Sequence, residues 1–165
     1  VELIKNKIES LPQKDQFRLI IRKKNGGQSN ATNDGAFSAK YDWLAFLDSD
    51  DTWHSERLSL QAQQINMHGK DYHIYYCGHY IIYSPNLKRF VPATFEGDAS
   101  KIEKQVNVVG PTSRVIISKE AYLKVNGFDP LMPVCNDWDC WIRVTNYFKI
   151  KYFFSIYLYD WLFLF

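Results

Sequence analysis

The sequence has few of the features that mark a specialised class of protein. Its three cysteines, Cys77, Cys135 and Cys140, include no C-x-x-C pair, which argues against a disulfide framework or a structural zinc site and favours a reducing, cytoplasmic setting. No apolar run reaches the roughly 18 residues that a membrane-spanning helix needs, and the chain opens without a secretory signal pattern. The formal net charge of +2 gives no strongly basic surface, so nucleic acid is not an expected partner.

The length indicates one domain. A chain of 165 residues is long enough to bury a sizeable core and short for two domains. It contains no internal repeat and no low-complexity linker. We therefore treat residues 1–165 as a single domain, with an aromatic C-terminal tail over residues 152–165.

The first half alternates helical and strand patterns. Apolar residues recur at helical spacing over residues 1–11, and Pro12 ends that pattern. A short buried strand is predicted at residues 17–21, "FRLII", and a helix capped by Ser29 after the glycine turn that follows it. The run "DWLAFLD" predicts a strand that ends at Leu47 and is covered on both faces. This order favours crossover units and the α/β class.

The second half continues with shorter elements. We expect a helix ended by Gly69, strands around Gly78, a polar surface loop, a strand, a helix capped by Ser118 and ended by Gly127, and a last helix capped by Asn136. The helix has Leu58, Ala62 and Ile65 on one face, and the elements after it lie near residues 72–83, 84–107, 112–118, 119–125 and 137–148.

Three aspartates follow the predicted strand at once. In "FLDSDDTW", Asp48, Asp50 and Asp51 come directly after apolar residues, and the carboxyl ends of strands are where open α/β sheets bind ligands. Carboxylate oxygens suit Mg²⁺ or Mn²⁺, and such an ion commonly bridges the protein to a diphosphate. The alternative is that the three acids only solvate a turn and favour the N-terminus of the next helix.

Two other metal motifs were considered for the same stretch. An EF-hand loop requires glycine at its sixth position, where this sequence has Trp53, so that motif is excluded. The string DxDxT also fits a haloacid dehalogenase-type phosphatase. That family normally has the motif after its first strand and has glycine in place of Asp51, so it is kept as an alternative in which Asp48 is the nucleophile and Asp50 the acid.

The surrounding residues resemble the family 2 glycosyltransferases of the GT-A fold. The family pattern N-x-G-x-S-x-A-x-N-x-G, a strand, D-x-D-D and x-W is similar to "NGGQSNATNDG" followed by "WLAFLDSDDTW". A second block, "VIISKEAYLKVNGFDP" and then "NDWDCWIRV", resembles the family's strand, short helix, G-F-D and E-D-x-D-x-W-x-R segments. The two blocks have the family's order and together cover residues 17–148.

The resemblance implies a fold and an activity. The fold would be a Rossmann-like, mainly parallel sheet flanked by helices, with an antiparallel portion in the acceptor half. The activity would be inverting transfer of a hexose or N-acetylhexosamine from a nucleotide-diphosphate sugar, with a UDP-sugar as the expected donor, to a hydroxyl of a surface glycan or glycolipid. Mn²⁺ or Mg²⁺ would assist. The expected location is the cytoplasm, at the inner face of the cytoplasmic membrane.

The resemblance also assigns roles to individual residues. Asp48 and Asp50 would hold the metal, and the donor would contact these two acids and the residues Asn25, Gly27, Asn33 and Asp51. Asp137 would be the general base that takes the acceptor's proton, although an acid at this place can also serve a helix dipole without doing chemistry. Trp138, its neighbour, is the best candidate for contact with the acceptor.

Departures from the family pattern leave alternatives open. Asn136 stands where the family usually has glutamate. A complete family domain opens with a strand, a helix and a second strand that ends in an acidic D-D-x-S segment. Nothing of that unit precedes Val1, so this chain is expected to be N-terminally incomplete, or an inactive, carbohydrate-binding relative. The aromatic tail would pack as a last strand and helix or lie on a membrane, and its lack of a lysine-rich polar face favours packing.

Overall fold

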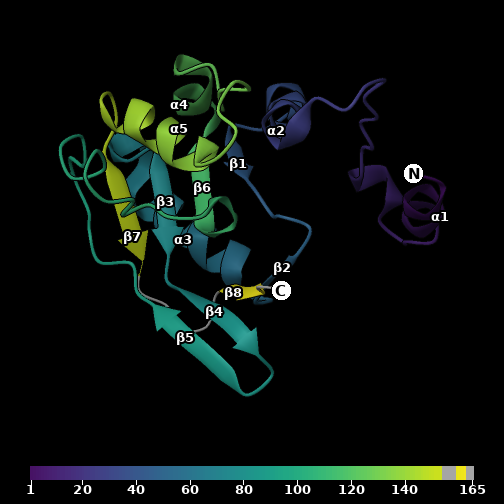
Figure 1. The fold of residues 1–165 in the computed structure, drawn as a ribbon, viewed down its shortest axis with the longest axis horizontal. Coiled ribbons are helices and arrows are strands. Elements are labelled where there is room, and N and C mark those ends of the chain that lie inside the picture. Colours follow the sequence, from purple (N-terminus) through teal and green to yellow (C-terminus); the bar gives the residue numbers. More distant parts are fainter. Residues whose placement is uncertain (154–158, 163–165) are drawn as a thin grey trace.

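The computed structural model describes residues 1–153 and the backbone of residues 159–162, and Figure 1 shows how the elements are arranged. The α-helices are α1 (Glu2–Glu9), α2 (Gly27–Ser38), α3 (Arg57–His68), α4 (Lys119–Lys124) and α5 (Asn136–Thr145). The strands are β1 (Trp43–Ala45), β2 (Asp51–Trp53), β3 (Ile74–Cys77), β4 (His79–Ser84), β5 (Leu87–Val91), β6 (Val115–Ser118), β7 (Ile150–Phe153) and β8 (Tyr159–Leu162). Short 3₁₀ turns lie at Lys14–Gln16, Gly69–Asp71 and Thr112–Arg114.

The central sheet has the strand order β1-β6-β3-β7. Strand β6 pairs antiparallel with both β1 and β3, and β3 pairs parallel with β7. Strands β1, β3 and β7 therefore point in the same direction, and β6 alone in this sheet is reversed. The prediction of a mainly parallel α/β sheet with an antiparallel portion is confirmed.

A second four-stranded sheet lies beside the first, with the order β2-β8-β4-β5. Strand β8 pairs antiparallel with β2 and parallel with β4. The predicted surface loop over residues 84–107 is wrong in its first part, because β4 and β5 form an antiparallel hairpin there. Of the aromatic tail, Tyr152 and Phe153 belong to β7 and residues 159–162 form β8, and residues 154–158 and 163–165 lie outside the described residues.

The core lies between the central sheet and the helices α2, α4 and α5 (Figure 1). Strand residues alternate between the two faces of a sheet, so Ile74, Tyr76, Val115 and Ile117 join this core. The residue between the last two, Ile116, lies on the opposite face and lines a hollow of about 360 Å³ beside α3. Leu58, Ala62 and Ile65 line the same hollow from α3. This hollow lies on the face of the sheet away from the core.

The predicted strand at residues 17–21 is wrong. These residues are exposed and belong to no strand. Apolar, β-branched composition favours a strand only when a neighbouring strand supplies hydrogen bonds and side-chain contacts. Residues 17–21 pair with no described strand, and Arg18 instead donates to the Ser38 carbonyl at the end of α2, 2.6 Å away. The predicted helix at the N-terminus is confirmed as α1, which buries none of its residues and lies apart from the packed body (Figure 1).

Two of the expected helix caps are also wrong, and two helix ends are confirmed. Helix α2 begins at Gly27 without a side-chain cap, so Ser29 lies inside the helix. Cys135, in a left-handed conformation, precedes α5, and Asn136 is its first residue. Ser118 does cap α4, accepting a hydrogen bond from the Ala121 amide, and Gly69 ends α3 with φ of 57°. Within the described part of the chain, no helix is long and apolar enough to cross a membrane.

Candidate functional site

The acidic turn begins two residues after β1. The strand ends at Ala45, earlier than the sequence predicts, and Leu47 is 49% exposed. The Asp48 amide donates to the Ser113 hydroxyl at 2.9 Å instead of to a neighbouring strand, and the Asp48 carbonyl accepts from the Asp51 amide at 3.1 Å. The backbone therefore turns at Asp48, which places the three aspartates close together.

The three aspartates have different surroundings. Asp48 is half-buried, Asp50 is exposed, and Asp51 is buried at the start of β2. Burial raises the pKa of Asp48, and the negative charges of Asp51 and Asp50 raise it further, whereas a hydrogen bond from Gln28 opposes them. Because the negative form of Asp48 is disfavoured by its surroundings, a bound cation would relieve a real electrostatic cost.

The first turn of α2 connects the two sequence blocks. The Asn25 side-chain oxygen accepts from the Gly27 amide at 3.0 Å, and Gly27 has φ of 80°, a conformation that favours glycine. The next residue, Gln28, donates to the Asp48 carboxylate at 3.2 Å. Ser29 then accepts from the Asn136 side chain at 2.7 Å. Consecutive residues of one helix thus contact the acidic turn and the start of α5.

Asp137 lies in the first turn of α5. Its carboxylate accepts from the Trp138 amide at 2.7 Å, and its own amide donates to the Asn136 side chain at 2.9 Å. Burial raises the pKa of Asp137, and hydrogen bonding of its carboxylate to the backbone amides of Trp138 and of Asp137 itself lowers it. The charge of Asp137 also contributes to raising the pKa of Asp48, so these two predicted site residues lie near enough for their charges to interact.

Trp138 is fixed by a contact outside its helix. Its indole N–H donates to the carbonyl of Glu103 at 2.7 Å, and the ring is half-buried. Part of the side chain therefore remains available beside Asp137, as contact with an acceptor requires.

Asn33 is not placed with the other predicted site residues. It is buried, its side-chain oxygen accepts from the Tyr122 hydroxyl at 2.6 Å and the Phe128 amide at 3.0 Å, and its nitrogen donates to the Phe128 carbonyl at 2.8 Å. These bonds connect α2 to the segment after α4. The structure gives Asn33 a role in packing, so we do not retain it as a donor ligand.

Three residues that contact the site were not predicted from the sequence. Gln28 and Ser113 position Asp48, and Glu103 positions Trp138. Gln28 lies inside the glycine-rich motif, so its position next to the first helical turn was a usable signal. Ser113 and Glu103 are distant in sequence and carry no spacing pattern that points to the site.

The carboxylates fit a metal ion that is shared with a ligand. Among residues 1–153, no group of three or more His, Cys, Asp or Glu side chains is arranged to hold a metal alone. The hard oxygens of Asp48 and Asp50 match Mg²⁺ or Mn²⁺, which typically completes its shell with water and substrate phosphates. The site therefore fits a cation that the protein and a diphosphate hold together.

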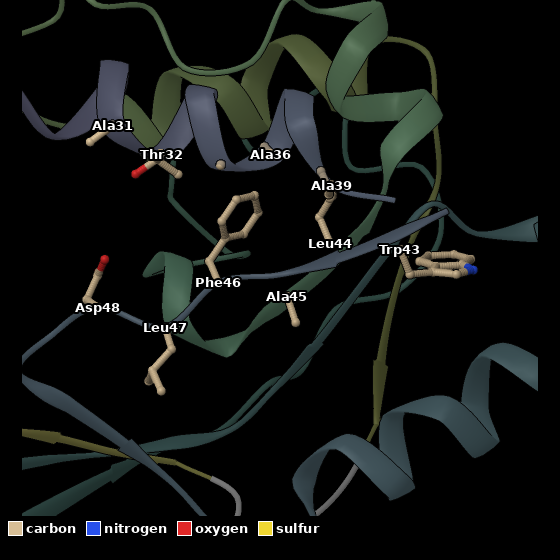
Figure 2. A pocket seen from close by; sticks show the side chains of 11 residues that line it. Ala31, Thr32, Ala36, Ala39, Trp43, Leu44, Ala45, Phe46, Leu47 and Asp48 are labelled. Carbon is tan, nitrogen blue, oxygen red and sulfur yellow. The ribbon is translucent and has the colours of Figure 1, made fainter. Parts of the chain in front are cut away.

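A hollow of about 400 Å³ leads away from Asp48 along β1. Figure 2 shows this hollow between α2 and the segment that runs from β1 to Asp48. Ala31 and Thr32 lie above it on α2, Phe46 points toward the helix, and Asp48 lies at one end. Strand β1 is the edge of the central sheet in the described part of the chain. The hollow therefore joins the acidic turn to an open sheet edge.

Comparison with known proteins agrees with this architecture. The family model described as "Glycosyl transferase family 2" matches residues 1–128. The chain is 26% identical over 137 residues to a Haemophilus influenzae protein named "Uncharacterized glycosyltransferase", covering 78% of this chain and 44% of that protein. The chain thus spans less than half the length of this curated relative.

Solved structures show the same fold. The Staphylococcus aureus protein TarS, as residues 1–349 in complex with UDP-GlcNAc, superposes with a TM-score of 0.77 at 17% identity over 98% of this chain and 46% of that one. A structure of S. aureus TarS covering 99% of this chain and 29% of that one has a TM-score of 0.75 at 16% identity. With the family match, these likenesses confirm the expected GT-A fold.

Proposed function

The chain belongs to glycosyl transferase family 2, and on this basis we propose that it carries the donor and base groups of an inverting sugar transfer from a UDP-sugar to a glycan hydroxyl. The observation that carries the proposal is the first turn of α2, which holds Asp48 through Gln28 and the start of α5 through Ser29. A donor-binding acid and a base must face one substrate, and the contacts of this turn with Asp48 and with Asn136, the neighbour of Asp137, support that arrangement. Family membership also leaves no support for the phosphatase alternative.

We assign the donor diphosphate to the acidic turn and the start of α2. Asp48 and Asp50 would hold the cation, and the cation would neutralise charge on the leaving diphosphate. Asn25 and Gly27 shape the N-terminus of α2, whose free amides and dipole favour an anion. Asp51 supports the turn from its buried position. A UDP-GlcNAc complex of TarS, a protein with the same fold, supports UDP-sugars as the donors to test first.

We assign the acceptor to the start of α5. Asp137 is half-buried, and the loss of solvent raises its pKa; a carboxylate with raised pKa is a better base for a hydroxyl proton. Trp138 beside it offers an aromatic face of the kind that packs against sugar rings. The two residues would orient the acceptor and accept its proton as the bond to the sugar forms.

Thermal shift assays test donor binding directly. A ligand that binds only the folded chain raises its melting temperature, so we expect UDP and UDP-GlcNAc to stabilise the protein with Mn²⁺ and to do so much less without it. Asp50→Ala should remove the Mn²⁺-dependent part, because this exposed acid contributes charge to the site and no core packing. Asp42→Ala, an exposed aspartate before β1, is the matched control and should behave like the parent.

An equal Mn²⁺-dependent shift in the parent and in Asp50→Ala would contradict the metal assignment. Absence of any UDP shift in a folded parent chain would contradict donor binding by these 165 residues.

A further inference from the structure

Glu103 is an unusual residue for a surface segment. It lies between β5 and β6, yet its side chain is fully buried. One carboxylate oxygen, Oε2, accepts from the amides of Val108 and Val109 at 3.2 and 3.3 Å. The other, Oε1, is buried and has no hydrogen-bond partner among the described residues. A buried carboxyl group with one oxygen that accepts no hydrogen bond lowers the stability of the folded chain. A turn with a purely structural role does not require a carboxyl group at such a position.

A short series of contacts joins Glu103 to Asp137. The Glu103 carbonyl accepts from the Trp138 indole at 2.7 Å, and the Trp138 amide donates to the Asp137 carboxylate at 2.7 Å. The next tryptophan of α5, Trp141, donates to the Gly110 carbonyl at 2.9 Å. The segment from Glu103 to Gly110 is thus attached to α5 at two places, in both cases through its main-chain carbonyls.

The charged and titratable groups around Glu103 come from three elements. The negative charge of Asp137 on α5 raises the pKa of Glu103, and the positive charge of Arg114, next to β6, lowers it. The charge of Glu103 in turn raises the pKa of the Tyr76 hydroxyl on β3. Burial is the largest effect and raises the pKa of Glu103 to about 7, the Val109 and Val108 amides lower it, and the charge of Asp137 raises it further.

We propose that Glu103 is a positioning residue for Asp137: its main-chain carbonyl holds the Trp138 indole beside that carboxylate, its buried Oε2 holds the amides of Val108 and Val109, and its charge acts on Asp137. The inference rests on the proposed function, in which Asp137 is the base. Below pH 7 Glu103 is neutral. Above pH 7 it becomes negative, and a second negative charge beside Asp137 makes that carboxylate a stronger base.

The coupling can be measured on this chain without substrate. In a ¹³C NMR titration with carboxyl-labelled glutamate, Glu103→Gln identifies the Glu103 signal by its loss, and Glu120→Gln, an exposed position, is the control. We expect the Glu103 signal to titrate near pH 7 in the parent and at lower pH in Asp137→Asn, because the neighbouring charge is gone. An unchanged Glu103 titration in folded Asp137→Asn would overturn the proposal.

A kinetic measurement separates this proposal from the proposed function. In the parent, kcat for transfer should rise severalfold through an ionisation near pH 7. In Glu103→Gln that rise should vanish, while the KM for donor stays unchanged, since the acidic turn is not altered. Glu103→Gln with the parent's pH profile would overturn the role of Glu103. Failure of UDP and Mn²⁺ to bind the parent would instead overturn the proposed function and leave the titration result standing.

Discussion

Asn33 stabilises the junction between α2 and the segment after α4. Its side-chain oxygen accepts hydrogen bonds from the Tyr122 hydroxyl and the Phe128 amide, and its side-chain nitrogen donates to the Phe128 carbonyl. Asn33→Ala would remove these hydrogen bonds and leave the Phe128 amide and the Tyr122 hydroxyl with only their long mutual contact of 3.4 Å, at a cost of about 2–3 kcal/mol in the free energy of unfolding. Urea denaturation measures this loss, with the exposed Asn66→Ala as a control expected to change stability by less than about 0.5 kcal/mol. A stable Asn33→Ala protein that no longer binds UDP would show that Asn33 is a donor ligand after all.

Asp137 should lower the stability of the folded chain at neutral pH, although the proposed catalysis depends on it. Its pKa is raised by burial in the folded chain, so the folded state holds its proton more tightly than the unfolded state does. Stability from this group is therefore highest at low pH and falls as pH rises through the interval between the unfolded and folded pKa values. Asp137→Asn has no charge to bury, so its melting temperature at neutral pH should equal or exceed that of the parent.

The same variant should lose activity. Without a base at this position, kcat should fall by about 10²- to 10⁴-fold, while UDP and Mn²⁺ affinities stay near normal, the pattern of an interaction made chiefly in the transition state. Steady-state kinetics and the thermal shift assay measure the two properties separately. Transfer within about threefold of the parent, well below the usual effect of a general base, would make Asp137 only a helix-start acid.

At the scale of elements, Arg143 connects α5 to the end of α4. It pairs with Asp139 at 2.6 Å and donates to the carbonyls of Val125 and Gly127 at 2.5 and 2.8 Å. Arg143→Lys keeps the charge but cannot reach both carbonyls and the carboxylate with one ammonium group. We expect a loss of about 1–3 kcal/mol in unfolding free energy, and a smaller loss for Lys124→Ala on α4. Equal effects of the two substitutions would contradict a structural role for this network.

How far the elements could be predicted depended on whether their partners were local. Helix α3 and the cap of α4 follow from residues within one turn, and both were predicted correctly. Residues 17–21 have strand composition but no neighbouring strand, and composition alone cannot supply one. The hairpin of β4 and β5 was missed although Pro85 and Asn86 stand between the paired residues Ser84 and Leu87, a turn signal that should have been used.

The site was predictable in the same measure. Asp48 and Asp50 could be predicted because ligands bind at the ends of strands in open α/β sheets. Asp137 could be predicted because its segment resembles the family's second motif. Ser113 reaches Asp48 across 65 positions and Glu103 reaches Trp138 across 35, and no local pattern encodes such contacts. They depend on the packing of the sheet, which only the structure provides.

At the scale of the whole molecule, several apolar residues are exposed on the side that carries the edge strand β1 of the described chain. Phe17, Ile20 and Ile21 are 50%, 43% and 53% exposed, and Tyr41 beside β1 is 81% exposed. A hollow of about 850 Å³ separates the segment around Phe17 from the end of α2. Exposed apolar residues next to an unpaired strand edge favour pairing with another chain.

We therefore predict that the isolated 165-residue chain associates with itself as its concentration rises. Sedimentation velocity should show larger species at high concentration, because each added copy covers apolar surface that water otherwise contacts. Ile20→Lys places a charge on this side and should shift the distribution toward monomer, whereas Leu123→Lys, on α4 and 48% exposed, should leave it unchanged. The lysine of Ile20→Lys can weaken association only if the side around β1 forms the contact between copies. An equal response of the two variants would therefore assign association to another surface. A parent chain that stays monomeric at every concentration would contradict the prediction itself.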